Sequence, residues 1–105
     1  MMQVQFHPGS HTAAREPLAE RAQEIVNDAL ARFADQITRV EVHVSDDNGP
    51  KRGVGDKRCT MEARVTGHPP VAVTHHAATL REAIGGAAEK LERSLDHTLG
   101  RLDRR

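Results

Sequence analysis

Apolar and polar residues alternate in four short stretches of the chain, which is the period-two pattern of half-buried strands. These stretches cover residues 2–6, 39–45, 59–65 and 71–76. His-Pro-Gly at 7–9 ends the first stretch, and a turn-rich segment from Asp46 to Asp56 separates the second from the third. Gly-His-Pro at 67–69 forms a tight turn before the fourth stretch. The last three strands are therefore predicted to form an antiparallel meander.

Two segments instead have apolar residues at three- and four-residue spacing, which is typical of amphipathic helices. The first runs from Pro17 to Phe33, and Pro17 suits a first helical turn. The second begins at Thr79 and continues to Leu102, nearly the end of the chain. The order β-α-β-β-β-α predicts an α+β fold, with a parallel, right-handed first crossover and two helices packed on one face of a four-stranded sheet. The other face is expected to be polar, with Arg39, Glu41, His43, Thr60, Glu62 and Arg64.

The composition fits a single domain over residues 1–105. Apolar residues make up 37% of the 105 residues and charged residues 29%, enough to bury a modest core. No apolar run approaches the roughly 20 residues that span a bilayer, and the first ten residues have no secretion-signal pattern. A cytoplasmic protein with no membrane partner is expected. The single cysteine, Cys59, falls at an apolar position of its strand, so a buried thiol in a reducing compartment is predicted.

Overall charge does not favour nucleic-acid binding, since 15 Lys and Arg balance 15 Asp and Glu. The chain has no Trp or Tyr, and both Phe6 and Phe33 lie on apolar faces. The chain therefore does not belong to the class of proteins that bind single-stranded nucleic acids by stacking bases on exposed aromatic rings. A nucleic-acid function would have to depend on how the charges are distributed.

The second predicted helix separates its charges into stripes when it is wound at about 100° per residue. One stripe is basic and consists of Lys90, Arg93, His97, Arg101 and Arg104. The adjoining stripe is acidic and consists of Glu82, Glu89, Glu92, Asp96 and Asp103. A line of cations on a rigid helix could contact several backbone phosphates of an RNA. The alternative is a solvated helix face whose acids pair with these bases.

Further candidate RNA contacts lie outside that helix. Arg21 and Arg32 are eleven residues apart on the first predicted helix and so nearly in line, although ordinary surface charges would look the same. Lys51 and Arg52 lie in the long loop between the second and third strands, which fits either a functional loop or plain disorder.

Other kinds of site lack support in the sequence. No phosphate-binding glycine motif, catalytic triad or carboxylate pair is recognisable, so no enzymatic activity, cofactor or small-molecule substrate is expected. His7 with His11, and His75 with His76, do not have a zinc-binding spacing, and no metal site is predicted. Gly85 and Gly86 each cost a helix about 1 kcal/mol relative to Ala. Close packing against a neighbouring element is the simplest explanation, and close approach of an RNA backbone is a second one.

Several longer segments resemble one family. They are FADQI at 33–37 followed by TRVEVHV, SDDNGPK at 45–51, DKRC at 56–59, and AIGGAAEKLERSL at 83–95. Together they are similar to the ribosome hibernation-promoting factors, which include ribosome-associated inhibitor A and proteins once described as sigma-factor modulators. The resemblance covers nearly the whole chain.

The resemblance implies a fold like that of a double-stranded-RNA-binding domain with an extra strand. It also implies binding to the small ribosomal subunit and its ribosomal RNA, in the channel between head and body, where transfer RNA and messenger RNA would be blocked during stress or stationary phase. Lys90 and Arg93 match the family's Lys-Leu-x-Arg pattern, and Arg101, Arg104 and Arg105 lie where relatives are basic. A short form is implied, without the C-terminal dimerisation domain of long members and monomeric on the ribosome.

A different class of function remains open at this stage. The same fold could serve as a protein-interaction module that contacts a regulatory partner through the polar face of its sheet. Binding to phosphates should depend more steeply on salt than binding through a mixed-charge protein interface.

Overall fold

The computed structural model describes the backbone of residues 2–9, 16–46 and 57–103, and the side chains of residues 2–9, 18–46 and 57–99. Four strands form one sheet: β1 (Gln3–Pro8), β2 (Ile37–Asp46), β3 (Lys57–Val65) and β4 (Val71–Ala77). The helices are α1 (Glu16–Ala29), the short 3-10 helix η1 (Ala31–Phe33) and α2 (Leu80–Asp103). None of the described helices has the length and hydrophobicity needed to span a membrane.

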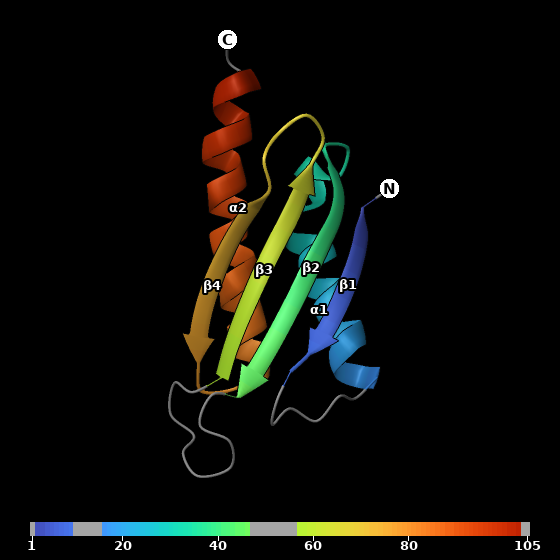
Figure 1. Ribbon diagram of the computed structural model, residues 1–105, viewed down its shortest axis with the longest axis vertical. Helices are drawn as coiled ribbons and strands as arrows, with labels where there is room; N and C mark the ends of the chain where they lie inside the picture. The colour runs from blue at the N-terminus through green and yellow to red at the C-terminus, as the bar shows by residue number, and fades with distance from the viewer. Residues whose placement is uncertain (1, 10–15, 47–56, 104–105) are drawn as a thin grey trace.

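The sheet has the strand order β1-β2-β3-β4 (Figure 1). β1 pairs with β2 in parallel, and β2, β3 and β4 follow one another antiparallel. The predicted element order and strand directions are confirmed. β1 and β4 are the two edge strands, so each has one row of backbone groups outside the sheet ladder.

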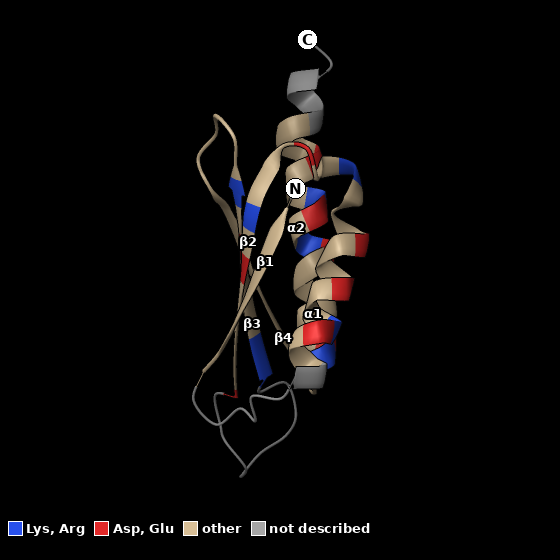
Figure 2. Cartoon of the chain, turned by 90° about the vertical axis from the view of Figure 1, so that its right-hand side faces the viewer, with Lys and Arg blue, Asp and Glu red and all other residues tan. Residues whose placement is uncertain are grey.

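Both helices cover the same face of the sheet, as the edge-on view shows (Figure 2). The core lies between the helices and that face, and it takes alternate residues from the strands because successive side chains point to opposite sides. Its strand members include Val40, Val42, Val44, Cys59, Met61 and Ala63. Its helix members include Val26, Leu30, Ile84, Leu91 and Leu95. The prediction of an α+β fold with two helices on one face is confirmed.

Helix α1 ends earlier than predicted, at Ala29 rather than Phe33. Leu30 leaves the helical region with φ −109° and ψ 17°, and the Phe33 amide then donates to the Leu30 carbonyl at 2.9 Å. This tighter turn places Phe33 in the core, 5% exposed. The sequence has no glycine or proline near this point to signal the change, so the prediction of one continuous helix was wrong in its last turn.

The start of α2 is marked by a clear capping signal in the sequence. Thr79 caps α2: its Oγ1 accepts from the Glu82 amide at 3.1 Å, and its carbonyl accepts from the Ala83 amide at 2.9 Å. Thr79 and Glu82 have the spacing of a capping box.

The turn before β4 is formed as predicted, and Gly67 adopts φ 71°, a conformation that favours glycine.

Gly85 and Gly86 have different surroundings. A Cβ atom on Gly86 would collide with the ring of His75, which reaches across from β4. A Cβ atom on Gly85 would meet nothing within 4 Å, because this residue lines an open groove of about 500 Å³ between α1 and α2. Close packing therefore accounts for Gly86 and not for Gly85.

Cys59 is fully buried in β3, as the alternation of apolar residues predicted. Burial raises the pKa of its thiol to about 12, because the thiolate would lose its hydration in the core.

Candidate nucleic-acid interface

The basic stripe of α2 contacts β4, one of the two edge strands, through Lys90. Lys90 Nζ donates a hydrogen bond to the carbonyl of Thr74 in β4 at 2.9 Å, while the Lys90 side chain stays exposed. One turn earlier, Gly86 packs under His75 of the same strand. The ammonium has three donors, so the contact with Thr74 leaves Lys90 able to bind a phosphate as well.

Arg93 and His97 continue this stripe towards the C-terminal end of the helix, and both are exposed. Within the described ranges, Arg93 makes no hydrogen bond or ion pair, so its guanidinium is available to a ligand. His97 does have an interaction within the protein. Arg101 lies on α2, but its side chain is outside the described part of the chain, as are Arg104 and Arg105 entirely.

The acidic stripe of α2 faces the other way, towards η1. Arg32 Nη2 lies 2.6 Å from Glu92 Oε2 and 3.0 Å from Asp96 Oδ1. The sequence left open whether the acids of α2 pair with the basic stripe of the same helix. For these two acids the partner is instead an arginine from a different element, and the charge of Lys90 and Arg93 is not cancelled by them.

This arrangement changes how Arg32 is understood. It lies in η1, beyond the end of α1, so it does not share one continuous helix with Arg21 as the sequence predicted. Its guanidinium also stacks 4.5 Å above the ring of Phe33. The hydrogen bonds to Glu92 and then to Asp96 raise its pKa further above the ordinary value. Arg32 is exposed, but two carboxylates already neutralise its charge.

Arg21 also forms an ion pair with an acid, but a longer one than those of Arg32. Its Nη1 lies 3.3 Å from Glu24 Oε1 on the exposed surface of α1. Exposed pairs of this kind contribute little to stability, so they do not lock the side chain in place. Arg21 lies apart from the stripe along β4. Lys51 and Arg52 fall outside the described residues.

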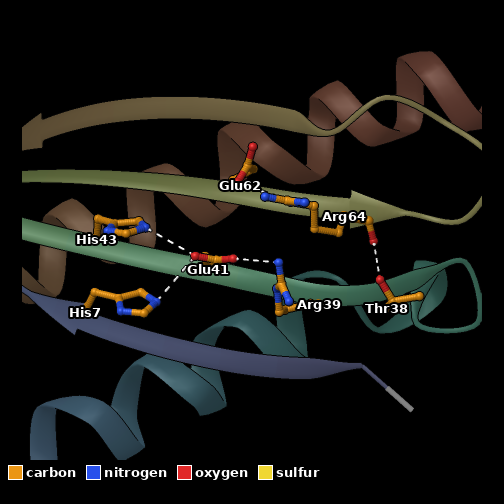
Figure 3. A network of polar contacts seen from close by, with 7 residues as sticks. All are labelled: His7, Thr38, Arg39, Glu41, His43, Glu62 and Arg64. Carbon is orange, nitrogen blue, oxygen red and sulfur yellow. Dashed lines mark hydrogen bonds and ion pairs between the residues drawn. The ribbon is translucent and has the colours of Figure 1, made fainter.

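The exposed face of the sheet carries a second group of cations that sequence reasoning did not include among the candidate contacts. Its members are Arg39, Arg58 and Arg64, which alternate with the buried core residues of β2 and β3 and so lie on the face opposite the helices. Arg39 pairs with Glu41 at 2.9 Å, and Arg64 lies 3.5 Å from Glu62 (Figure 3). The strand alternation already places Arg39 and Arg64 on this polar face, and Arg58 has the same parity as Arg64 in β3.

Solved structures share this fold. The N-terminal domain of Protein Y from Thermus thermophilus aligns with a TM-score of 0.73 and 18% identity, over 92% of this chain and 99% of the other. A ribosomal subunit interface protein from Coxiella burnetii aligns with a TM-score of 0.71 and 14% identity, over 95% of this chain and 99% of the other. The fold thus defines a class of small α+β domains with a mixed four-stranded sheet and two helices on one face.

The family is defined by sequence. The model of the family described as "Sigma 54 modulation protein / S30EA ribosomal protein" matches residues 4–103, and the chain belongs to this family. It is a family of ribosome-associated modulation proteins. No significant match was found among curated protein sequences. The resemblance seen in the sequence is confirmed.

Proposed function

We propose that this protein is a translation inhibitor that binds the small ribosomal subunit through ribosomal RNA in the head-body channel and sterically blocks the sites of transfer RNA and messenger RNA. It acts in the cytoplasm under stress or in stationary phase, as a monomer on the ribosome and without catalysis, cofactor or small-molecule substrate. A single domain over residues 1–105 is sufficient for this binding.

The observation that carries the proposal is the separation of charges on α2. Its acids Glu92 and Asp96 are paired with Arg32 of η1, while Lys90 contacts Thr74 of β4 and both Lys90 and Arg93 stay exposed. A neutral chain thus presents a basic edge on a rigid helix. Such an edge can contact successive phosphates and release their counterions.

The other candidate RNA contacts differ in how well the structure supports them. His97 continues the same stripe. Arg101, Arg104 and Arg105 were predicted from the sequence to belong to it, and their side chains lie outside the described residues. Arg21 and Arg32 are secondary because each has a carboxylate partner. The helix stripe is therefore the first surface to test, and the loop cations Lys51 and Arg52 are the second.

The test is co-sedimentation with purified small ribosomal subunits over a salt series. Native protein should bind with an affinity that falls by a log-log slope of about 0.7 to 0.9 per phosphate contact. The Lys90→Glu, Arg93→Glu double variant should bind much more weakly, with a slope reduced by roughly 1.4 to 1.8. A native protein that fails to bind at low salt would refute the proposal. Binding with a weak salt response would favour the protein-interaction alternative.

A matched control comes from the same helix. Arg81 is exposed and, like Arg93, makes no hydrogen bond or ion pair among the described residues, but it lies in the first turn of α2. Arg93→Glu should weaken subunit binding, while Arg81→Glu should leave it nearly unchanged. Thermal unfolding of both variants checks that the fold is intact. Equal loss in both would show that overall charge matters rather than the stripe.

The steric part of the proposal needs its own measurement. Saturating amounts of the protein should inhibit translation by purified ribosomes and should compete with transfer RNA for small subunits. Subunit binding without competition would retain ribosome association but reject the blocking mechanism.

A further inference from the structure

We propose that His7, Glu41 and His43 form a zinc-binding site on the exposed face of the sheet. His7 lies on β1, and Glu41 and His43 lie on β2 (Figure 3). The two strands are parallel neighbours, and their register pairs His7 directly with His43. Glu41 is two residues before His43 and so shares the same face. The site is separate from the helix stripe and does not depend on the proposed function.

The donor atoms converge on one point. His7 Nε2 lies 3.5 Å and His43 Nε2 lies 3.6 Å from the same carboxylate oxygen, Glu41 Oε1. All three residues offer ligand atoms within 4.8 Å of one another. The imidazole rings stack 4.5 Å apart at 16°, so both present the same edge to the carboxylate.

The distances from the two histidine nitrogens to Glu41 Oε1 fit a shared metal ion better than direct hydrogen bonds. A good hydrogen bond between nitrogen and oxygen measures about 2.7 to 3.2 Å, and both histidine contacts are longer. Zinc binds imidazole nitrogen and carboxylate oxygen at about 2.0 to 2.2 Å, which places two ligand atoms of a tetrahedral site about 3.3 to 3.6 Å apart. One ion could therefore bind all three with only small side-chain adjustments.

The environment of His7 is compatible with such a site. Its Nε2 atom is buried and makes no hydrogen bond among the described residues, although 43% of the His7 side chain is exposed. The long 3.5 Å contact with Glu41 Oε1 leaves this atom without a good hydrogen bond, and a shared metal ion would satisfy it.

The donors also indicate which ion is bound. Two imidazoles and one carboxylate are typical zinc ligands, whereas calcium and magnesium prefer oxygen alone. Three protein ligands leave a fourth position on the exposed side of the sheet for water. Arg39 Nη2 holds the other carboxylate oxygen, Glu41 Oε2, at 2.9 Å and leaves Oε1 directed to the histidines. Arg39 is therefore a positioning residue for the carboxylate.

Metal binding would join β1, an edge strand, to the centre of the sheet through side chains. The ion binds the native arrangement and not the unfolded chain, so it should raise the melting temperature. The expected role is a structural clamp between β1 and β2.

The test uses untagged, chelator-treated protein titrated with zinc chloride in a calorimeter. Native protein should bind one ion per chain. His43→Gln should weaken binding by more than about tenfold. His76→Gln is the matched control, because His76 is also an exposed histidine on this face of the sheet but lies on β4, outside the cluster. No saturable binding by the native protein, or equal binding by His43→Gln, would overturn the proposal.

Two further readouts do not depend on the strength of binding alone. Cobalt in place of zinc should give the intense visible absorption of a tetrahedral site in the native protein and in His76→Gln, but not in His43→Gln. Zinc should raise the melting temperature of the same two proteins only. Because His43 has 52% of its side chain exposed, its replacement should leave the metal-free protein folded. A native cobalt spectrum typical of six oxygen ligands would contradict the assigned donors.

Discussion

Arg32 and Glu92 join η1 to α2 through an ion pair of 2.6 Å, although 60 residues separate them in the chain. Burial of the apolar face of α2 turns Glu92 and Asp96 to the side that meets η1 and Lys90 to the side that meets β4. The cations near α2 are therefore of two kinds. Arg32 is neutralised by acids of the same protein. Arg93 has no such partner among the described residues and is available to bind a polyanion.

The first prediction compares one member of each group. Arg93→Gln should reduce the salt slope of small-subunit binding by about 0.7 to 0.9, because an available guanidinium is lost. Arg32→Gln should change the slope far less, because Glu92 and Asp96 already neutralise Arg32. Co-sedimentation at several salt concentrations measures both. An equal change in the two variants would mean that the ion pairs of Arg32 open when RNA binds.

The second prediction concerns the two glycines of α2. Gly85→Ala should stabilise the protein by about 1 kcal/mol, since the new methyl enters an open groove and the helix gains a better helix former. Gly86→Ala should destabilise it by roughly 1 to 3 kcal/mol, since the methyl meets the ring of His75. Urea unfolding measures both changes. The penalty at Gly86 should largely disappear in a His75→Ala background, and a penalty that persists there would rule out this collision as its cause.

The third prediction follows from the buried thiol of Cys59. The pKa of about 12 in the folded state exceeds the ordinary value of 9.0. The contribution of the thiol to stability is therefore complete below about pH 9 and is lost progressively up to about pH 12. Between pH 7 and pH 10, native protein should lose roughly 1 to 2 kcal/mol more of its free energy of unfolding than Cys59→Ala. An identical pH dependence of the two proteins would contradict a protonated, buried thiol.

The fourth prediction concerns the base of the hairpin between β2 and β3. Asp46 is buried, with 8% of its surface exposed. Lys57 lies opposite it in the register of β2 and β3, and Lys57 Nζ is 3.1 Å from Asp46 Oδ2. Lys57→Met should cost roughly 1 to 3 kcal/mol, because it leaves a mostly buried carboxylate without its counter-ion. The measurement is urea unfolding, with the exposed Arg81→Met as control. Asp46→Asn should cancel most of the cost in the double variant, and failure to do so would reject the pair as its source.

Much of the fold could be predicted from local patterns alone. Alternation identified all four strands, and the three- and four-residue spacing identified both helices, because burial on one side gives each element its own period. Thr79 and Glu82 mark the start of α2 through contacts only three residues apart. The end of α1 was not predictable in this way, since the turn at Leu30 brings Phe33 into the core without any glycine or proline.

For the candidate sites, the sequence by itself determined the composition of each helix stripe and the face of the sheet on which each polar residue lies, because both follow from the geometry of a single element. Only the tertiary structure decided which charges remain available. Arg32 comes from another element to neutralise Glu92, and the parallel register of β1 and β2 brings His7 beside His43 across 36 residues. Such contacts depend on how elements pack and pair, and no periodicity within one segment records them.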